Sequence, residues 1–366
     1  MNSNLKMIVA GGGTGGHFFP AQAICESLRN KGVKVKYMGS RYGIESNYFN
    51  NNSSEEILLN IRGIQRQFNL DAWLKNCLFP YKFILSYLRS RKIISEFKPH
   101  VVIGTGGYSS GLPLLAAIHK DVKTVIQEQN SFPGMTTRRL GTKVNKVCIA
   151  FEEAKGYLKK KNVILTGNPI REDIRLMDKA KAKQSYHFDA GRPVLAILGG
   201  SQGSAPLNRH FQQHCQKYTD SGIQILWQCG KNDYDELQQS IDAKDVHLIP
   251  FSDEMGTLYS AADLIVSRAG ALALSEMALM GKAMVLIPFP HAAGDHQVKN
   301  ALAFSNSGAA VILPQFQLKS GDLETTVLEL FQQPDKIKGM EEKSIQMAAP
   351  DAISKIISTI MEIAES

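Results

Sequence analysis

Short apolar runs alternate with amphipathic segments along the whole chain. The runs with the composition of buried strands are residues 7–10, 33–38, 101–103, 123–127, 193–198, 223–228, 246–249 and 285–287. Segments between them, such as residues 20–30 and 297–304, carry apolar positions at helical spacing. Strands that alternate with helices in this way are typical of α/β proteins with parallel sheets, and we expect this fold class in both halves of the chain.

A turn near mid-chain divides the two halves. The Gly-Asn-Pro sequence at residues 167–169 breaks regular structure, and a chain of 366 residues is long enough for two domains. We therefore expect the first domain at residues 1–165 and the second at residues 166–349. The last segment, residues 350–366, has a stripe of isoleucines at helical spacing, which predicts a helix packed against a core.

The first apolar run ends in the stretch GGGTGGHFFP. Thr14, Gly15 and Gly16 precede His17, and Pro20 opens the amphipathic segment that follows. Strand, glycine loop and helix therefore follow one another, which puts His17 at the N-terminus of the helix. Backbone N–H groups can approach a ligand closely at such a loop, and the positive helix end favours anionic groups. The same helix end disfavours imidazolium, so we expect His17 to be neutral and able to accept a proton.

The same glycines allow a second interpretation. Gly11, Gly13 and Gly16 fit the G-x-G-x-x-G pattern of dinucleotide-binding folds. The second predicted strand ends in Gly-Ser-Arg and not in the acidic residue that the ribose of NAD requires, although Arg41 suits NADP. On the first half alone, an NADP-dependent dehydrogenase therefore stays open.

The second half of the chain changes this picture. It has a glycine loop of its own at residues 199–204. Further along, SRAGALALSE predicts a helix that starts at Gly270 and carries the carboxylate of Glu276 about two turns in. The N–H groups of a helix start can hold a diphosphate, and a carboxylate can accept hydrogen bonds from both hydroxyls of a ribose. The combination indicates a nucleotide-sugar site and makes the NADP-dependent dehydrogenase the less favoured interpretation.

The net charge of +8 indicates an anionic partner, such as a phosphorylated substrate or an acidic lipid surface. Nucleic acid is not expected, because the sequence has no dense Lys/Arg tract and no zinc-ligand spacing. The five cysteines are scattered, which is typical of reduced thiols in a cytosolic protein and predicts neither a disulfide framework nor a metal site. We also expect no signal peptide and no transmembrane segment, since no uncharged apolar run is long enough.

Residues 68–98 interleave aromatic and aliphatic side chains with basic ones. One interpretation is one or two helices that pack on the core and turn a basic face to solvent. The alternative is an amphipathic surface that rests on anionic lipid headgroups. The residues that we expect to meet a membrane are Trp73, Leu78, Phe79, Lys82, Phe83 and Arg89.

Seven motifs occur in one order along nearly the whole chain, namely GGGTGGHFFP, GTGGYSSG, EQN, TGNPIR, GGSQGS, SRAGALALSE and PFPHAAGDHQ. Together they resemble the MurG family, the UDP-N-acetylglucosamine–N-acetylmuramyl-(pentapeptide) pyrophosphoryl-undecaprenol N-acetylglucosaminyltransferases of bacterial peptidoglycan synthesis. The resemblance implies the GT-B fold, with two facing Rossmann-like domains, an interdomain cleft and a C-terminal helix that packs back on the first domain. It also implies a first domain that faces acceptor and membrane and a second domain that binds UDP-GlcNAc.

The resemblance also assigns roles to residues that match the motifs. Ser201 would contact the diphosphate, Arg171 would lie beside the donor, and the backbone at Ser252 would read uracil. Gln297 would bind the GlcNAc hydroxyls. The implied donor residues are Thr14, Gly15, Gly16, Asn130, Arg171, Ser201, Gln202, Ser252, Gly270, Ala271, Leu272, Ala273, Leu274, Ser275, Glu276 and Gln297, and the implied acceptor residues are Gly106, Gly107 and Tyr108. Gln127 departs from the family pattern, which often has His before Glu-Gln-Asn.

The implied reaction moves GlcNAc with inversion from UDP-GlcNAc to the 4-hydroxyl of MurNAc in undecaprenyl-diphospho-MurNAc-pentapeptide (lipid I), giving lipid II. His17 and Glu128 are the candidates for the base that removes the hydroxyl proton, and no cofactor or metal is expected. The expected partners are the anionic inner face of the cytoplasmic membrane, where the protein is peripheral, and a cell-wall synthesis complex. Two alternatives stay open, namely another lipid-directed GT-B enzyme, such as a diacylglycerol glycosyltransferase, and a non-catalytic nucleotide-sugar-binding subunit.

Overall fold

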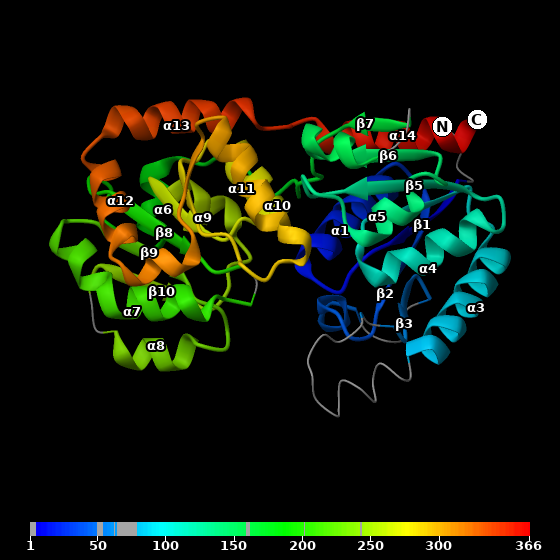
Figure 1. Ribbon diagram of the computed structural model, residues 1–366, viewed down its shortest axis with the longest axis horizontal. Coiled ribbons are helices and arrows are strands. Elements are labelled where there is room, and N and C mark those ends of the chain that lie inside the picture. Colours follow the sequence, from blue (N-terminus) through cyan, green and yellow to red (C-terminus); the bar gives the residue numbers. More distant parts are fainter. Residues whose placement is uncertain are drawn as a thin grey trace. The chain divides into compact units, whose positions relative to one another are not determined.

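The chain divides into two compact units, which Figure 1 shows as ribbons. The computed structural model describes residues 5–49, 54–61, 63, 79–158, 162–200, 202–241 and 244–366. The first unit comprises Met1–Ile170 and Pro350–Ser366, and the second comprises Arg171–Ala349. The division after Ile170 follows the Gly-Asn-Pro turn by one residue.

The first unit is built on a seven-stranded parallel sheet. Its strands are β1 (Lys6–Ala10), β2 (Lys34–Ser40), β3 (Glu56–Leu59), β4 (Val101–Gly104), β5 (Lys123–Glu128), β6 (Lys146–Ile149) and β7 (Val163–Leu165). Their order is β3-β2-β1-β4-β5-β6-β7. The order runs outward in both directions from the β1–β4 pair, in which Met7 lies opposite Val101 and Ala10 opposite Gly104.

Helices cover both faces of this sheet. Successive side chains of a strand point to opposite sides, and here both sides carry apolar side chains that must be shielded from water. The helical segments are α1 (Gly15–Asn30), η1 (Ile44–Asn47), α3 (Phe79–Phe97), α4 (Gly107–Ile118), α5 (Met135–Leu140), η2 (Glu152–Tyr157) and α14 (Ala352–Glu365). Met7 and Val9 of β1 belong to the core beneath α1 and α14. Ile8 and Ala10 belong to the core on the other face, beneath α3 and α4. All four side chains are fully buried, so the apolar run at residues 7–10 is a strand covered on both faces.

The last helix of the chain completes the first unit. Ile356, Ile357, Ile360 and Ile363 of α14 are buried in the same cluster as Met7 of β1. Burying an aliphatic side chain stabilises a fold by about 1.5–3 kcal/mol. The isoleucine stripe at residues 350–366 therefore ties the end of the chain to the unit in which the chain begins.

The second unit repeats the arrangement with a six-stranded parallel sheet. Its strands are β8 (Val194–Leu198), β9 (Gln224–Gln228), β10 (Val246–Ile249), β11 (Leu264–Ser267), β12 (Met284–Leu286) and β13 (Ala310–Ile312), in the order β10-β9-β8-β11-β12-β13. The helical segments are α6 (Lys179–Ser185), α7 (Ala205–Asp220), α8 (Tyr234–Ser240), α9 (Met255–Ala261), α10 (Ala271–Leu279), η3 (Ala293–Asp295), α11 (His296–Asn306), η4 (Gln315–Lys319), α12 (Asp322–Phe331) and α13 (Pro334–Gln346). Phe211, Tyr218 and Trp227 are among the largest fully buried side chains of its core.

The expected fold class is confirmed, because both units are α/β with parallel sheets. None of the described helices combines the length and the apolar character that a bilayer span requires.

Candidate active site

The strand order of each sheet reverses once, and many of the predicted site residues follow the strands at these two reversal points. The reversals lie between β1 and β4 in the first unit and between β8 and β11 in the second. Open parallel sheets bind ligands at the carboxyl ends of the two strands beside such a point. The loops that leave β1, β4, β8 and β11 are therefore the places where each unit is built to receive a ligand.

His17 lies in the first turn of α1, directly after the β1 loop. Its Nδ1 is 3.0 Å from the Thr105 carbonyl oxygen and 2.9 Å from Gln129 Oε1. Both partners accept, so Nδ1 carries the proton and donates it to them. In the neutral ring Nε2 then carries the lone pair, and His17 is poised to accept a proton at that atom.

The side chain of Gln129 is held in the orientation that His17 needs. Its amide nitrogen donates to the carbonyl oxygens of Thr105 at 2.8 Å and of Gln127 at 3.1 Å. Its carbonyl oxygen is consequently the atom that faces His17. Motif reading did not single out Gln129 or Thr105 as partners of His17, because they follow β5 and β4 and meet α1 only in the folded sheet.

Gln127, the departure from the family pattern, takes part in the same buried network. Its amide nitrogen donates to Asn168 Oδ1 at 3.1 Å, and its side-chain oxygen accepts from Gln129. The amide nitrogen of Asn168 in turn donates to the backbone carbonyl oxygen of Gln129 at 3.2 Å. The TGNPIR and EQN motifs are thus hydrogen-bonded to each other behind His17.

The glycines predicted to bind the acceptor bring the β4 loop close to His17. Gly106 and Gly107 have φ angles of 101° and 75°, which favour glycine. A Cβ atom on Gly106 would lie 2.6 Å from His17 Nδ1, and one on Gly107 would lie 2.5 Å from the Gly12 carbonyl oxygen. Tyr108 follows in the first turn of α4 and is 39% exposed. Gly106, Gly107 and the candidate base therefore form one continuous site.

Glu128, the second candidate base, is buried at the end of β5. Its Oε1 accepts from the backbone N–H of Asn130 at 3.1 Å and from the Asn130 amide at 3.2 Å. Its Oε2 accepts from the backbone N–H of Gly134 at 3.0 Å and from the hydroxyl of Thr137. Four donors thus surround the carboxylate, which braces the loop that carries Asn130. The geometry favours His17 as the base.

Glu45 of η1 contacts the first glycine loop, and motif reading missed it. Its carboxylate is fully buried and accepts from the Gly13 N–H at 2.9 and 3.0 Å and from the Ser40 N–H at 2.6 Å. A Cβ atom on Gly12 would lie 2.2 Å from Glu45 Oε1. The N–H of Gly13 therefore serves Glu45, and ligand binding is left to the exposed helix start at Thr14 and Gly16.

In the second unit, the loop after β8 leads into the N-terminus of α7. Gly200 and Gly203 have positive φ angles of 88° and 77°, and Gln202 is exposed. Ser201, the predicted diphosphate contact, lies outside the described residues. The loop has the glycine backbone and the helix start that a diphosphate site needs.

Arg268 stands behind this loop, directly after β11, and is the main residue of the second site that motif reading missed. Its guanidinium donates to the Ser204 hydroxyl at 2.8 Å, to the Ile287 carbonyl oxygen at 3.0 Å and to Gln315 Oε1 at 2.6 Å. Burial lowers the pKa of Arg268 to about 10, so the side chain is charged at neutral pH. Arg268 therefore connects the loops that follow β8, β11 and β12 and supplies a positive charge beside the predicted diphosphate site.

Glu276 lies in the second turn of α10, whose N-cap is Gly270. Its carboxylate is buried, and Tyr259 donates a hydrogen bond to Oε2 at 2.8 Å. Burial raises the pKa of Glu276 to about 7, although the hydrogen bond from Tyr259 and the charge of Arg171 act in the opposite direction. The predicted residues Ala271–Glu276 thus form one helix start, with Arg171 within electrostatic reach of its carboxylate.

Two other predicted donor contacts already have partners in the second unit. The backbone N–H of Ser252 donates to Gln228 Oε1 at 3.1 Å. Gln297, in the first turn of α11, accepts from the backbone N–H of Phe289 at 2.9 Å. Asn300 of the same helix donates to the Ala269 carbonyl oxygen at 3.2 Å, which joins α11 to the loop before α10.

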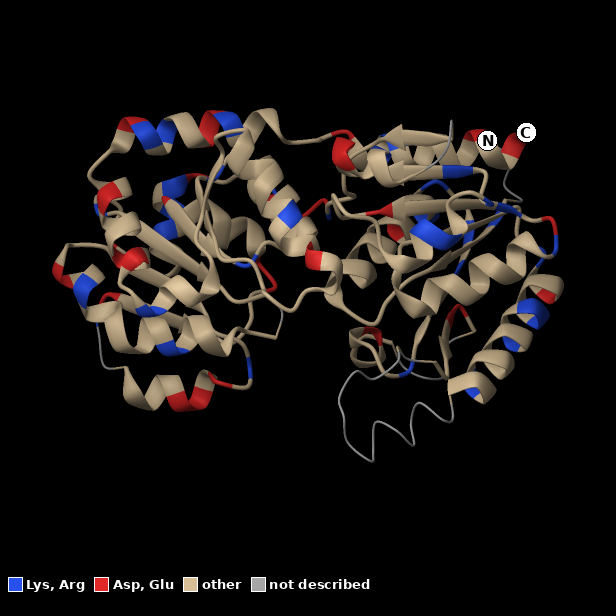
Figure 2. Ribbon diagram, viewed as in Figure 1, with Lys and Arg blue, Asp and Glu red and all other residues tan. Residues whose placement is uncertain are grey.

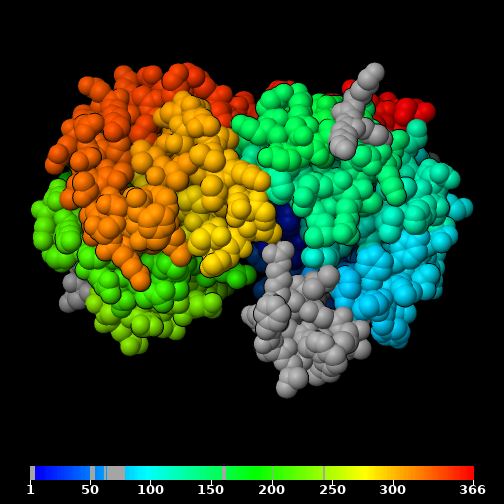
Figure 3. All heavy atoms as spheres, in the orientation of Figure 1, coloured from blue at the N-terminus to red at the C-terminus, as the bar shows by residue number. Residues whose placement is uncertain are grey.

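The apolar residues that were predicted to meet a membrane do not form the exposed side of α3 where the structure describes them. Trp73 and Leu78 lie outside the described residues, whereas Phe79 and Phe83 are partly buried against the core of the first unit. The exposed apolar residues of the helix are instead Tyr81, Ile84, Leu85 and Leu88. Figure 2 shows that Lys and Arg recur along α3, and Figure 3 shows the helix at the surface of its unit. The helix therefore has a core-facing side and a free amphipathic side.

Two domain families match the chain in the order of its two units. The glycosyltransferase family 28 N-terminal domain matches residues 7–149, and the glycosyltransferase family 28 C-terminal domain matches residues 194–356. The two matches show that the chain has the two-domain fold of a family 28 glycosyltransferase.

Similar proteins narrow the class. A UDP-N-acetylglucosamine–N-acetylmuramyl-(pentapeptide) pyrophosphoryl-undecaprenol N-acetylglucosamine transferase of Flavobacterium psychrophilum is 36% identical, with 99% of this chain and 98% of the relative covered. A protein of the same name from Chlorobium luteolum is also 36% identical, with 99% and 100% covered. The crystal structure of Acinetobacter baumannii MurG has a TM-score of 0.75 at 26% identity and covers 98% of this chain and 99% of that one. This chain belongs to the MurG family of glycosyltransferases.

Proposed function

We propose that this chain transfers GlcNAc with inversion from UDP-GlcNAc to the 4-hydroxyl of MurNAc in lipid I and so forms lipid II of peptidoglycan synthesis. The substrates are proposed from the names of relatives that match over nearly the full length of the chain. The reaction type is supported above all by His17, whose Nδ1 is held by two acceptors so that Nε2 is free to take a proton.

In the proposed mechanism, His17 Nε2 removes the proton of the acceptor 4-hydroxyl as the oxygen attacks the anomeric carbon of GlcNAc. The bond between that carbon and the β-phosphate oxygen breaks, and UDP leaves with the negative charge. The imidazolium that forms on His17 keeps donating from Nδ1 to Thr105 and Gln129, which stabilises the charged ring and maintains its orientation. Glu128 positions Asn130 in the same loop.

The second unit would bind the donor. The helix starts of α7 and α10, together with Arg268 and Arg171, would offset the charge of the diphosphate. Glu276 would accept the ribose hydroxyls, the backbone at Ser252 would read uracil, and Gln297 would bind the GlcNAc hydroxyls. In the first unit, Thr14, Gly15, Gly16 and Asn130 are the residues that we propose as further donor contacts.

We further propose that α3 brings the first unit to the anionic inner face of the cytoplasmic membrane, where the protein is peripheral and meets its cell-wall synthesis partners. Tyr81, Ile84 and Leu88 are 64%, 55% and 52% exposed, and their spacing of three and four residues places them on one side of the helix as an exposed apolar strip. Arg91 and Lys92 are exposed on the same helix. Apolar side chains beside basic ones are the combination that an anionic lipid surface favours.

A transfer assay with a short-chain lipid I analogue tests this function. The purified chain with UDP-GlcNAc should convert the analogue to a disaccharide product and should leave diacylglycerol unchanged. Turnover on diacylglycerol alone would favour another lipid-directed glycosyltransferase. UDP-GlcNAc binding without turnover on either acceptor would favour a non-catalytic binding subunit.

A further inference from the structure

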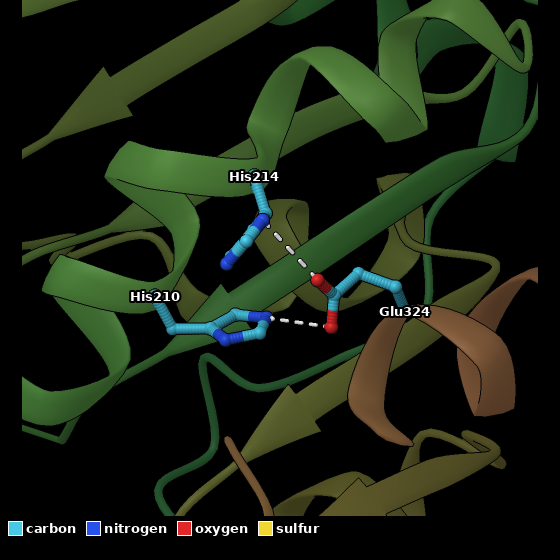
Figure 4. A group of neighbouring side chains, drawn as sticks. All are labelled: His210, His214 and Glu324. Atoms are coloured by element: carbon cyan, nitrogen blue, oxygen red, sulfur yellow. Dashed lines mark ion pairs between the residues drawn. The ribbon is translucent and has the colours of Figure 1, made fainter. Parts of the chain in front are cut away.

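Three side chains on two helices of the second unit converge in a place that the proposed reaction does not use. His210 and His214 lie four residues apart on α7, and Glu324 lies on α12. Nε2 of His210 is 3.4 Å from one carboxylate oxygen of Glu324, and Nδ1 of His214 is 3.2 Å from the other. In Figure 4, a dashed line joins one ring nitrogen of each histidine to the Glu324 carboxylate. One potential ligand atom of each residue lies within 4.8 Å of the other two.

The central atoms of this cluster are buried and lack hydrogen bonds. His210 is 4% exposed and Glu324 is 5% exposed. Among the described residues, Nε2 of His210 and both carboxylate oxygens of Glu324 have no hydrogen-bond partner. Leaving a buried polar atom without a hydrogen bond costs about 1–3 kcal/mol, and more for a charged group. The cluster is therefore incomplete without a further occupant.

The orientation of His210 identifies what is missing. Its Nδ1 is 2.9 Å from the Leu318 carbonyl oxygen and must donate to it, so in the neutral ring the lone pair of Nε2 points at Glu324. A lone pair that faces a carboxylate is repelled unless a cation lies between them.

We propose that His210, His214 and Glu324 form a binding site for a divalent transition-metal ion, for which Zn²⁺ is the best match. Two imidazoles and one carboxylate are a known ligand set for Zn²⁺, with a fourth position open to water. Ligand atoms about 2.0–2.1 Å from a tetrahedral Zn²⁺ lie about 3.3 Å from one another. The two separations of 3.4 and 3.2 Å run to different oxygens of Glu324, and one ligand atom from each residue lies within 4.8 Å of the others, so the three side chains would draw closer around a bound ion. The carbonyl of Leu318 orients His210 in the way that metal-bound histidines require.

The neighbours of the cluster agree with a metal that enters from solvent. The side chain of His214 is 30% exposed, which leaves room for a water ligand and a path of entry. The ammonium group of Lys217 is 3.6 Å from Glu324 Oε1, but this side chain is 61% exposed and free to swing away. A metal here would tie α12 to α7, the helix that begins directly after the predicted diphosphate loop. The proposal does not depend on the proposed reaction.

Zn²⁺ binding to the whole chain, without a polyhistidine tag and after treatment with a chelator, tests the proposal. Competition with a chromophoric chelator should give one tight Zn²⁺ per chain. Second-shell changes alone cost about 10–100-fold in metal affinity, so loss of a ligand in His214→Gln or Glu324→Gln should cost more than about 100-fold. His187→Asn, which changes an exposed histidine of the same unit, should bind like the parent. Absence of saturable binding, or equal affinity in all variants, would overturn the site.

Two further measurements keep the test independent of misfolding. Lys217→Met removes the competing ammonium and should tighten Zn²⁺ binding several-fold, a gain that a damaged fold would not produce. Co²⁺ bound in place of Zn²⁺ should give the visible d–d bands of a site with nitrogen and oxygen ligands, and Glu324→Gln should alter them. A near-ultraviolet thiolate-to-cobalt band would instead assign the metal to a cysteine such as Cys215, and the proposal would fall.

Discussion

The strand, glycine loop and helix sequence occurs at the reversal point of both sheets, yet opposite charges stand behind the two loops. In the first unit, the carboxylate of Glu45 fills the turn and takes the N–H of Gly13. In the second, the guanidinium of Arg268 supports the loop through Ser204. A carboxylate consumes donors and repels a second anion, whereas a guanidinium attracts one. A glycine loop is therefore not a phosphate site by itself, and the charge behind it decides what it binds.

The largest expected effect is the loss of transfer activity when His17 is removed, which tests whether the first loop serves catalysis. His17→Ala should lower kcat by about 10²–10⁴-fold, because it removes the proposed general base. The affinity for UDP should stay the same, since the charge that holds the diphosphate lies in the second unit. Transfer kinetics and UDP titration by calorimetry measure the two effects separately. If Glu128→Gln abolishes transfer while His17→Ala retains near-parent activity, the assignment of the base is wrong.

The next effect concerns the charge behind the second loop. Arg268→Met should weaken UDP binding by about 1.5–3 kcal/mol, roughly 10- to 150-fold, through lost charge-assisted interactions. Arg268→Lys should not restore the affinity for UDP, because an ammonium cannot reach Ser204, Ile287 and Gln315 at the same time. Circular dichroism and UDP titration check folding and affinity.

Glu45→Gln is the matched variant in the first loop. It should lower the free energy of unfolding by about 1–3 kcal/mol, because a buried acceptor of N–H groups becomes a poorer one, and it should leave UDP affinity unchanged. Equal losses of UDP affinity in the Glu45 and Arg268 variants would remove the contrast between the two loops.

Glu276→Gln should have opposite effects on binding and stability. UDP binding should weaken by about 1.5–3 kcal/mol, because a neutral amide replaces the carboxylate that accepts the ribose hydroxyls. The free protein should become more stable by up to about 3 kcal/mol at pH 8, since burial raises the pKa of Glu276 from 4.5 to about 7. Denaturant titrations of both proteins measure the gain, and a loss of stability in the variant at pH 8 would contradict it.

The sign of the pH dependence follows from the same raised pKa. The folded protein holds a proton on Glu276 that the unfolded chain releases near pH 4.5, so the stability of the parent falls as pH rises from 4.5 to about 7. UDP affinity should change in the reverse direction and fall as pH drops through about 7, where the carboxylate becomes protonated. Calorimetry with UDP-GlcNAc, whose diphosphate has no ionisation near neutral pH, should show this dependence from pH 6 to pH 8.5 in the parent and a flat profile in Glu276→Gln.

The smallest expected effect concerns the exposed side of α3 in the first unit. Replacing Ile84 and Leu88 with Ser should weaken binding to anionic vesicles by about 1 kcal/mol per side chain while stability is retained, because both are more than half exposed. Phe83→Ser is the matched control and should destabilise the fold, since Phe83 packs on the core. Vesicle sedimentation at low and high salt and thermal melting separate the two results. Undiminished binding by the Ile84 and Leu88 variant would assign the membrane contact to another surface.

Most of the fold could be predicted because its signals are local. Strands covered on both faces appear as continuous apolar runs, and Gly or Pro marks their ends. The run at residues 7–10 and the isoleucine stripe at residues 350–366 are clear examples. Prediction of the two α/β units required no knowledge of which strands are neighbours.

The site could be predicted only in part, because its contacts join distant residues. The motifs indicated His17 and the loop with Gly106, but the bond from His17 to Gln129 spans 112 residues. The role of Arg268 depends on Ser204, 64 residues away. Phe83 and Leu88 are both apolar members of one helix, and the sequence does not distinguish the core-facing residue from the exposed one.

By itself, the sequence determined the alternation of strands and helices, the two glycine loops and the helix that ends the chain, since each depends on spacing within a few turns of backbone. The tertiary structure decided that Glu45 stands behind one loop and Arg268 behind the other, and that His210, His214 and Glu324 meet. These juxtapositions follow from strand order and helix packing, which bring together side chains that no local pattern connects. Burial then strengthens the electrostatic interactions among these side chains, because a charge removed from water acts more strongly on its neighbours.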